Sequence, residues 1–302
     1  MGNTSGVVET PAKESEVMAE GDEELRRATD PDYGFQQIKS DLVVREVSLP
    51  LTTKATCPEG YIRVVCISDT HSKHTTIKKI PEGDILIHAG DFSNTGYEKE
   101  LDEFGKFFAG LPHKHKVIIA GNHDLSLDVE DYVKVHRKRF HRNRPEFDAQ
   151  ACRDRFTSNP GYHFLENDST VIEGLKIHGS PQSPWFCDWA FGPERGPDIQ
   201  KYWDRIPDDT DILVTHGPPL GYGDLCYPNN NRAGCYNLLR RVERVKPKYH
   251  IFGHIHEGYG AYTNAKDDTD PGTIFINAST ATYNYRMTNP PIVFDMKKPT
   301  DI

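Results

Sequence analysis

Short, almost continuously apolar runs recur along the chain, and each ends in glycine or in polar residues. They lie at residues 64–68, 85–90, 117–120, 212–215 and 250–253. Unalternating runs of this length are typical of strands that are covered on both faces. Between the second and third runs, Leu101, Phe104, Phe108 and Leu111 recur at helical spacing before Pro112. Strand, helix and strand therefore alternate, which predicts an α/β fold built in layers.

The remaining pattern predicts further elements. We expect an edge strand between residues 43 and 49, a polar helical segment from about 125 to 160, and short strands near 162–166, 170–173 and 175–179. Helices follow at 197–205 and 233–244, and closing strands at 273–278 and 292–295. The first 30 residues carry eight acidic and three basic side chains with little to bury. This favours a disordered acidic tail over residues 1–35, followed by one domain over residues 36–302.

Composition narrows the classes of protein. The net charge is -9, which argues against binding of extended nucleic acid through a broad basic surface. No apolar run is long enough to form a transmembrane segment, and no secretory signal is visible. The six cysteines are scattered, which favours reduced thiols and a cytoplasmic location. The first six residues resemble an N-myristoylation signal, with Gly6 where serine or threonine belongs; an ordinary flexible start is the favoured alternative.

Metal-binding residue types follow the five apolar runs. They are Asp69 and His71, Asp91, Asn122, His216, and His254 with His256. Residues two apart in a strand point the same way, so the D-x-H and H-x-H pairs each aim two ligands at one point. Carboxylates combined with imidazoles suit Mn, Fe or Zn. The absence of cysteine from the set argues against a structural zinc site.

The number of ligands suffices for two divalent metal ions, with Mn favoured and Fe or Zn as alternatives. One ion would take Asp69, His71 and His256, and the other Asn122, His216 and His254. Asp91 is the natural bridge, and it is counted with the catalytic residues. Two ions would make the site net positive on a negative protein, so that it attracts phosphate. Paired metals clamp the attacking and leaving oxygens of a displacement and supply a bridging hydroxide as nucleophile.

His123 follows the expected ligand Asn122 and is not needed as a ligand itself. A histidine at this position can hydrogen-bond the phosphate or protonate the leaving oxygen. His123 is therefore the second candidate catalytic residue. His123 and Asn122 are also expected to contact the substrate.

The ordered set of motifs resembles that of the calcineurin-like metallophosphoesterase superfamily, over roughly residues 61–295. The closer match is to the metallophosphoesterase-domain-containing (MPPED) family, which is similar to class III cyclic nucleotide phosphodiesterases. The stretches that carry it are CISDTHS, GDILIHAGDF, VIIAGNHD, SPWF, DILVTHGPPLGYGD, IFGHIHEGYG, INAST and NPPIVFD. The resemblance implies a four-layer α/β/β/α sandwich of the metallophosphoesterase type, with the site on loops at the strand ends. It also implies hydrolysis of phosphodiesters.

The same resemblance brings an aromatic loop, residues 180–191, toward the mouth of the site. Trp185 and Phe186, with Trp189 beside them, would stack a base, and Tyr222 would shape the rim. Ordinary packing is the alternative for these aromatics. Some family members carry glycine where His254 stands, which weakens their second metal. Because this chain keeps His254, both metals are expected to bind.

These observations predict a dinuclear metal-dependent phosphodiesterase that hydrolyses small nucleotide-like phosphodiesters, cyclic nucleotides above all. Two alternatives stay open at this point. The same ligand set would serve a phosphomonoesterase or nuclease, and a protein that kept the fold could act as a nucleotide-binding scaffold with little turnover. The sequence leaves the question of protein partners open.

Overall fold

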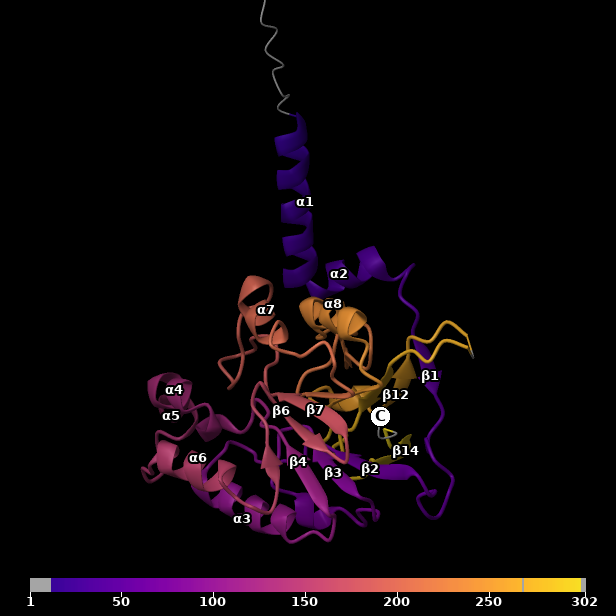
Figure 1. Cartoon of the computed structure of the whole chain (residues 1–302). Helices are drawn as coiled ribbons and strands as arrows, with labels where there is room; N and C mark the ends of the chain where they lie inside the picture. The colour runs from indigo at the N-terminus through magenta and orange to yellow at the C-terminus, as the bar shows by residue number, and fades with distance from the viewer. Residues whose placement is uncertain (1–11, 268, 300–302) are drawn as a thin grey trace, which may run out of the picture.

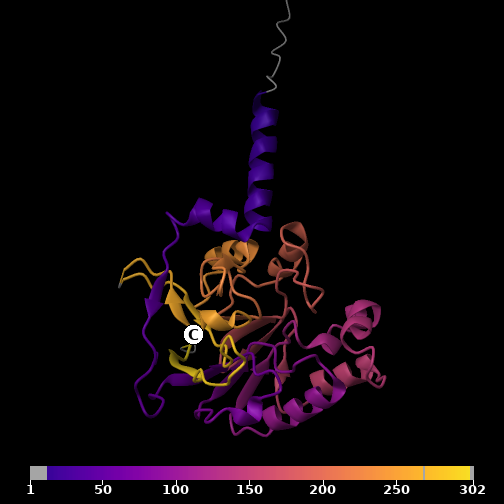
Figure 2. The ribbon, with the colours of Figure 1, turned by 180° about the vertical axis from the view of Figure 1, so that it is seen from behind.

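Two β-sheets lie face to face at the centre of the molecule, with helices on the outer face of each (Figure 1, and from behind in Figure 2). A computed structural model describes residues 12–267 and 269–299 of the chain. The arrangement is the predicted α/β/β/α sandwich. Three apolar clusters separate its four layers.

The first sheet has five strands, in the order β14-β2-β3-β4-β5. Their bounds are β14 (Ile292–Lys297), β2 (Tyr61–Ile67), β3 (Ile85–His88), β4 (His115–Ile118) and β5 (His163–Phe164). β2 to β5 are parallel, while β14 runs antiparallel to β2. The apolar runs are continuous because both faces are covered. In β2, Val64 and Cys66 pack between the sheets, whereas Val65 and Ile67 face the helices.

The second sheet has seven strands, in the order β1-β12-β13-β11-β8-β7-β6. Their bounds are β1 (Arg45–Val47), β12 (Gly260–Thr263), β13 (Ile274–Asn277), β11 (Tyr249–Phe252), β8 (Ile212–Thr215), β7 (Leu175–Ser180) and β6 (Asp168–Ile172). β7, β8, β11 and β13 are parallel. β1 is an edge strand, as its sequence predicts. A separate hairpin joins β9 (Leu225–Cys226) to β10 (Asn231–Arg232).

Helices cover the outer faces. α3 (Glu98–Ala109) and α6 (Ala149–Thr157) lie on the five-stranded sheet, where Phe104, Phe108 and Phe156 pack against it. α7 (Pro197–Trp203) and α8 (Tyr236–Val245) lie on the seven-stranded sheet. The segment expected to be helical from 125 to 160 is helical only in short pieces. It contains a 3₁₀ turn at Leu125–Leu127, α4 (Val129–Asp131), a π turn at Tyr132–His136 and α5 (Arg137–Phe140) ahead of α6.

The expectation of a disordered segment up to residue 35 is wrong for the residues described. α1 (Ala12–Thr29) and α2 (Pro31–Ile38) are helices, and α1 stands out from the body of the molecule in Figure 1. The reason is a small apolar set at the end of this segment. Ala28 is buried, and Phe35 and Ile38 pack on the cluster under α8. The expected disorder of residues 1–11 and the acylation of Gly2 lie outside the described residues.

Candidate metal centre

The five predicted ligand segments meet at one edge of the two sheets. Each follows the carboxyl end of a parallel strand, where ligands commonly bind in α/β sheets. The strands and their side chains are β2 with Asp69 and His71, β3 with Asp91, β4 with Asn122, β8 with His216, and β11 with His254 and His256. The sequence-predicted residues are therefore together in space, although 187 positions separate Asp69 from His256.

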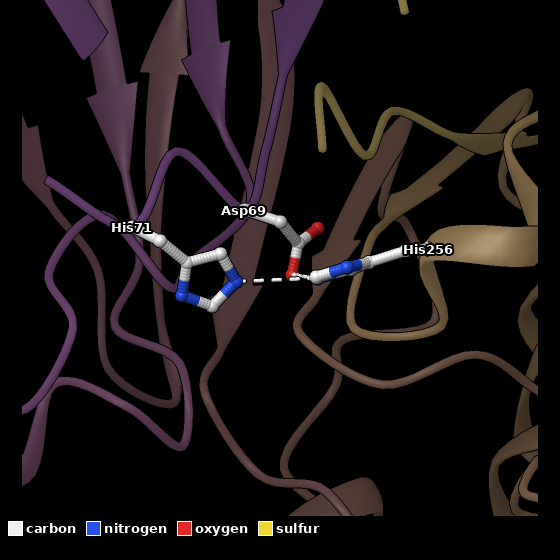
Figure 3. Close-up of side chains that lie close together, drawn as sticks. All are labelled: Asp69, His71 and His256. Carbon is white, nitrogen blue, oxygen red and sulfur yellow. Dashed lines mark hydrogen bonds and ion pairs between the residues drawn. The ribbon is translucent and has the colours of Figure 1, made fainter. Parts of the chain in front are cut away.

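The first ligand cluster consists of Asp69, His71 and His256, which point toward one another in Figure 3. Their ligand atoms all lie within 4.8 Å of one another. The Nε2 atoms of His71 and His256 are 3.2 Å apart, and Oδ1 of Asp69 is 3.6 Å from Nε2 of His256. All three side chains are buried. One cation between them would be within reach of two imidazoles and a carboxylate.

The second cluster consists of Asp91, His216 and His254, with Asn122 beside them. Nε2 of His216 lies 3.3 Å from Oδ1 of Asp91 and 2.8 Å from Oδ1 of Asn122. The other oxygen of Asp91 lies 3.9 Å from Nε2 of His71, in the first cluster. Asp91 thus stands between the two clusters, where a ligand shared by two ions has to stand.

The arrangement of the nitrogen and oxygen atoms is suited to binding cations. Nδ1 of His216 lies 2.9 Å from the backbone oxygen of Ala89, which only accepts, so Nδ1 carries the hydrogen. The Nε2 lone pair of neutral His216 then faces two oxygens, from Asp91 and Asn122. His256 repeats the pattern, with Nδ1 3.2 Å from the Thr282 oxygen. Buried acceptors that face one another need a proton or a metal ion between them.

The electrostatics agree with this fit. Burial lowers the pKa of His71 and of His254 to about 3, so both rings are neutral and offer lone pairs. Burial also opposes charge on His216, but Asp91 and Asp69 raise its pKa to about 9, so its Nε2 carries a proton that a bound cation would displace. Although burial works against its charge, His216 and its neighbours hold the pKa of Asp91 well below its usual range. The pocket therefore favours its carboxylates as anions and attracts positive charge.

The backbone around the ligands is strained and tightly held. Asp69, His71, Asp91 and His254 all have positive φ, between 41° and 67°. Such conformations cost about 1–3 kcal/mol each and persist where surrounding structure enforces them. Part of that structure is buried Asp124, whose carboxylate accepts hydrogen bonds from the backbone nitrogens of Asp91 and Gly121. This carboxylate locks the loop after β3 to the loop after β4.

His123 lies beside the ligands and at the wall of a cavity. Its ring stacks on Trp189, with centroids 4.1 Å apart, and its Nδ1 is 2.7 Å from the Asn94 backbone oxygen. That oxygen only accepts, so Nδ1 donates, and the ring orientation is fixed from behind. The other ring nitrogen, Nε2, forms no hydrogen bond within the described residues and is therefore available to a substrate.

A cavity of about 380 Å³ opens directly over the metal ligands. Its lining includes Asp91, Asn122, His254 and His256 together with exposed aromatic rings. These rings belong to Trp185, Phe186, Tyr283 and Tyr285. Trp185 and Phe186 were predicted from the sequence. The two tyrosines were not, because the loop between β13 and β14 that carries them has no motif to mark it.

Tyr222 does not belong to this cavity, and its prediction as a substrate-binding residue is wrong. Its side chain is 1% exposed and stacks on Phe275, with ring centroids 3.8 Å apart. Its hydroxyl donates to the backbone oxygen of Val43. Tyr222 is held in the core by a segment nearly 180 positions earlier in the chain, which the local sequence does not reveal.

Several polar residues near the centre form hydrogen bonds to the protein rather than facing the cavity. Asn277, at the end of β13, donates to the backbone oxygen of Ile255 at 2.8 Å, between His254 and His256. Three histidines outside the ligand set instead bond to hydroxyl groups, as expected for structural residues. The pairs are His88 with Thr70, His178 with Ser169, and His250 with Thr215.

Comparison with known proteins agrees with the fold and the ligand geometry. The family model for calcineurin-like phosphoesterases matches residues 62–258, which include all seven candidate metal ligands. The chain belongs to the calcineurin-like phosphoesterase family, whose members are dinuclear metal-dependent phosphoesterases. It is therefore a metal-dependent hydrolase of phosphate esters.

Within that family, the chain is similar to the metallophosphoesterase-domain-containing proteins. "Metallophosphoesterase domain-containing protein 1" of Homo sapiens is 40% identical over 257 residues, covering 83% of this chain and 76% of that protein. The protein of the same name from Mus musculus is equally similar. "UPF0046 protein T07D4.2" of Caenorhabditis elegans is 35% identical over 277 residues, covering 88% of this chain and 68% of that protein. Across residues 12–267 and 269–299, no helix is long and apolar enough to cross a membrane.

Proposed function

We propose that this chain is a phosphodiesterase for small nucleotide-like diesters, with cyclic nucleotides as the favoured substrates. The observation that carries the proposal is the cavity, which joins the metal ligands to a set of exposed aromatic rings. A volume of about 380 Å³ lies in the range of small-molecule sites. A phosphate over the ligands would leave a nucleobase within the aromatic part of the cavity.

The aromatic rings are free to receive a base. The exposed fractions of Trp185 and Phe186 are 47% and 62%, and those of Tyr283 and Tyr285 are 49% and 42%. Apolar side chains that are exposed together, rather than singly, commonly mark ligand-binding sites. Stacking of one base on an aromatic side chain contributes about 1–3 kcal/mol and tolerates different bases. We therefore expect binding of several nucleotides with modest preference among bases.

The charges of the lining favour a diester over a monoester. Among the described residues that line the cavity, Arg195 is the one arginine or lysine. Its guanidinium already donates to the backbone oxygens of Ala233 and Gly234, both at 2.8 Å. A monoester brings close to two negative charges, and such dianions usually recruit arginine. A diester brings one negative charge, which suits this lining better.

Each ligand has a role in the proposed reaction. Two divalent cations, held by Asp69, His71, Asp91, Asn122, His216, His254 and His256, supply Lewis acidity and activate water when bound. We propose Asp91 as the shared ligand, because it stands between the clusters. Asn122 orients the phosphate. His123, braced by Asn94 and Trp189, presents its free nitrogen to a phosphoryl or leaving oxygen.

A kinetic panel tests this function. Purified protein with Mn²⁺ would be given an aryl phosphodiester, 2′,3′- and 3′,5′-cyclic nucleotides and a matched aryl phosphomonoester. We expect the diesters to be cleaved with higher kcat/KM than the monoester. Faster cleavage of the monoester would replace the proposal with a phosphomonoesterase. Nucleotide binding without turnover, in protein that holds its metals, would replace it with a scaffold.

A further inference from the structure

A second group of metal-ligating side chains lies outside the active site, on the segment between the 3₁₀ turn at Leu125–Leu127 and α5. Asp128 precedes α4, Asp131 ends it, and His136 closes the π turn. A π turn bonds residues five apart, so Asp131 and His136 lie on the same side of it. Such turns occur frequently at functional sites.

The three side chains converge. Their ligand atoms all lie within 4.8 Å of one another. His136 is only 3% exposed, and among the described residues neither of its ring nitrogens has a hydrogen-bond partner of regular geometry. The backbone of Asp188 approaches one ring nitrogen and favours the protonated ring without reaching that geometry, so at least the other nitrogen is left for a ligand. A buried polar group without a hydrogen-bond partner costs about 1–3 kcal/mol of stability. A ligand that binds the free imidazole nitrogen would remove this cost.

The two carboxylates of this group have no ion-pair partner among the described residues. Within residues 12–267 and 269–299, neither Asp128 nor Asp131 forms an ion pair with lysine, arginine or histidine. The basic side chains nearby are paired elsewhere: Lys134 with Glu130, Arg137 with Glu146, and Arg139 with Asp188. Burial lowers the pKa of His136, so its ring is neutral. Two carboxylates and a neutral imidazole thus face one another without a directly paired counter-charge, because Lys134 interacts with both carboxylates only at longer range.

We propose that Asp128, Asp131 and His136 bind a divalent cation that is separate from the active-site pair. One imidazole nitrogen with two carboxylate oxygens suits Zn²⁺ or Mn²⁺ better than the harder Mg²⁺ or Ca²⁺. Asp131 is exposed, so water reaches the site and completes the coordination shell.

The position of the site gives the cation a structural task. Asp128 also accepts a hydrogen bond from the Phe191 backbone at 2.9 Å, and Arg139 pairs with Asp188. Phe140 packs on Trp189, with ring centroids 4.4 Å apart. Residues 128–140 therefore pack against the aromatic loop, residues 180–191. A cation bound here would restrict the movement of residues 128–140 and so help to position Trp185 and Phe186 in the cavity.

Zinc binding tests the site without reference to turnover. Full-length protein would be stripped with chelator, reloaded with a small excess of Zn²⁺, desalted and analysed for metal content. The test variant is Asp131→Asn, because the Asp131 side chain is exposed and forms no ion pair within the described part of the chain. The matched control is Glu130→Gln, an exposed neighbour that pairs only with Lys134. Crystals of the reloaded wild-type protein would provide anomalous diffraction at the zinc edge.

We expect about one zinc fewer per chain in Asp131→Asn than in the wild-type protein and in Glu130→Gln. We also expect an anomalous peak among Asp128, Asp131 and His136. Equal zinc content in all three proteins, with anomalous peaks confined to the active site, would overturn the proposal. Both results are independent of the substrate, so the outcome does not depend on the proposed phosphodiesterase activity.

Discussion

Replacement of Gly121 by alanine should disable the metal centre, because the added methyl group would crowd both the side chain and the backbone of Asp91. Gly121 precedes the ligand Asn122 and does not have positive φ, so alanine is compatible with its backbone. A Cβ at this position would lie 2.3 Å from Oδ1 and 2.4 Å from the backbone nitrogen of Asp91, and 2.6 Å from Cε1 of His216. The shorter distance falls about 1 Å below the 3.4 Å at which ordinary contact begins.

The displacement sets the size of the effect. Asp91 or His216 must move by roughly 1 Å, and a misplacement of that size can cost about 10²-fold in rate. Disturbed ligand orientation lowers metal affinity by about 10–100-fold. Because the backbone of Asp91 must shift as well as its side chain, the crowding should lower the free energy of unfolding by about 3 kcal/mol or more.

The assay measures metal content, hydrolysis of an aryl phosphodiester with saturating Mn²⁺, and thermal unfolding by circular dichroism. The control is Gly105→Ala in α3, where the nearest atom to a new Cβ, the Tyr162 hydroxyl, lies at 3.4 Å. We expect full activity in the control. A Gly121→Ala protein that keeps its metals and retains a rate within about threefold of wild type would refute the reasoning.

Three further predictions each concern one side chain or one pair of side chains. His123→Asn should lower kcat by about 10²-fold with unchanged metal content, as measured by steady-state kinetics and metal analysis. An unchanged kcat would exclude a catalytic role for His123. Trp185→Ala with Phe186→Ala should raise KM for cyclic nucleotides by tenfold or more without affecting a small dialkyl phosphate, and equal effects on both would argue against base stacking. The Arg63 hydrogen bond lowers the pKa of Asp295, so the unfolded state binds protons more readily and this stabilisation is lost as pH falls below about 4. Asp295→Asn should therefore lower the free energy of unfolding at pH 7 by on the order of 2 kcal/mol and have a progressively smaller effect as pH falls below about 4, as measured by urea titration; an equal loss at pH 7 and at low pH would contradict the linkage.

The convergence of the candidate ligands could be predicted because each of them follows an apolar strand. Parallel strands bring their carboxyl ends to one edge, so order along the chain was enough to bring Asp69 and His256 together. The continuous apolar runs predicted a layered α/β fold, whereas the order of the four layers was implied by the resemblance to the family. The assignment of Trp185 and Phe186 to the substrate is still a prediction, although both line the cavity.

Other features depend on contacts between distant segments. Ala28, Phe35 and Ile38 are too few to mark helices in an acidic stretch, and they become apolar anchors only when α8 is beside them. Proline and glycine surround Tyr222 in the sequence, which is typical of an exposed loop, but in the structure its ring stacks on Phe275 of β13. His136 lies in a basic run that resembles a solvated face. It is nevertheless buried, and the backbone of Asp188, in the aromatic loop, lies beside its ring.

The most direct measurement is a Mn²⁺ titration of chelator-stripped protein, following hydrolysis of an aryl phosphodiester, with Asp91→Asn in parallel. We predict no hydrolysis without metal, restored hydrolysis in the wild-type protein as Mn²⁺ is added, and none in folded Asp91→Asn. Hydrolysis that persists in chelator, or that Asp91→Asn retains, would contradict a reaction centred on two metal ions that share Asp91.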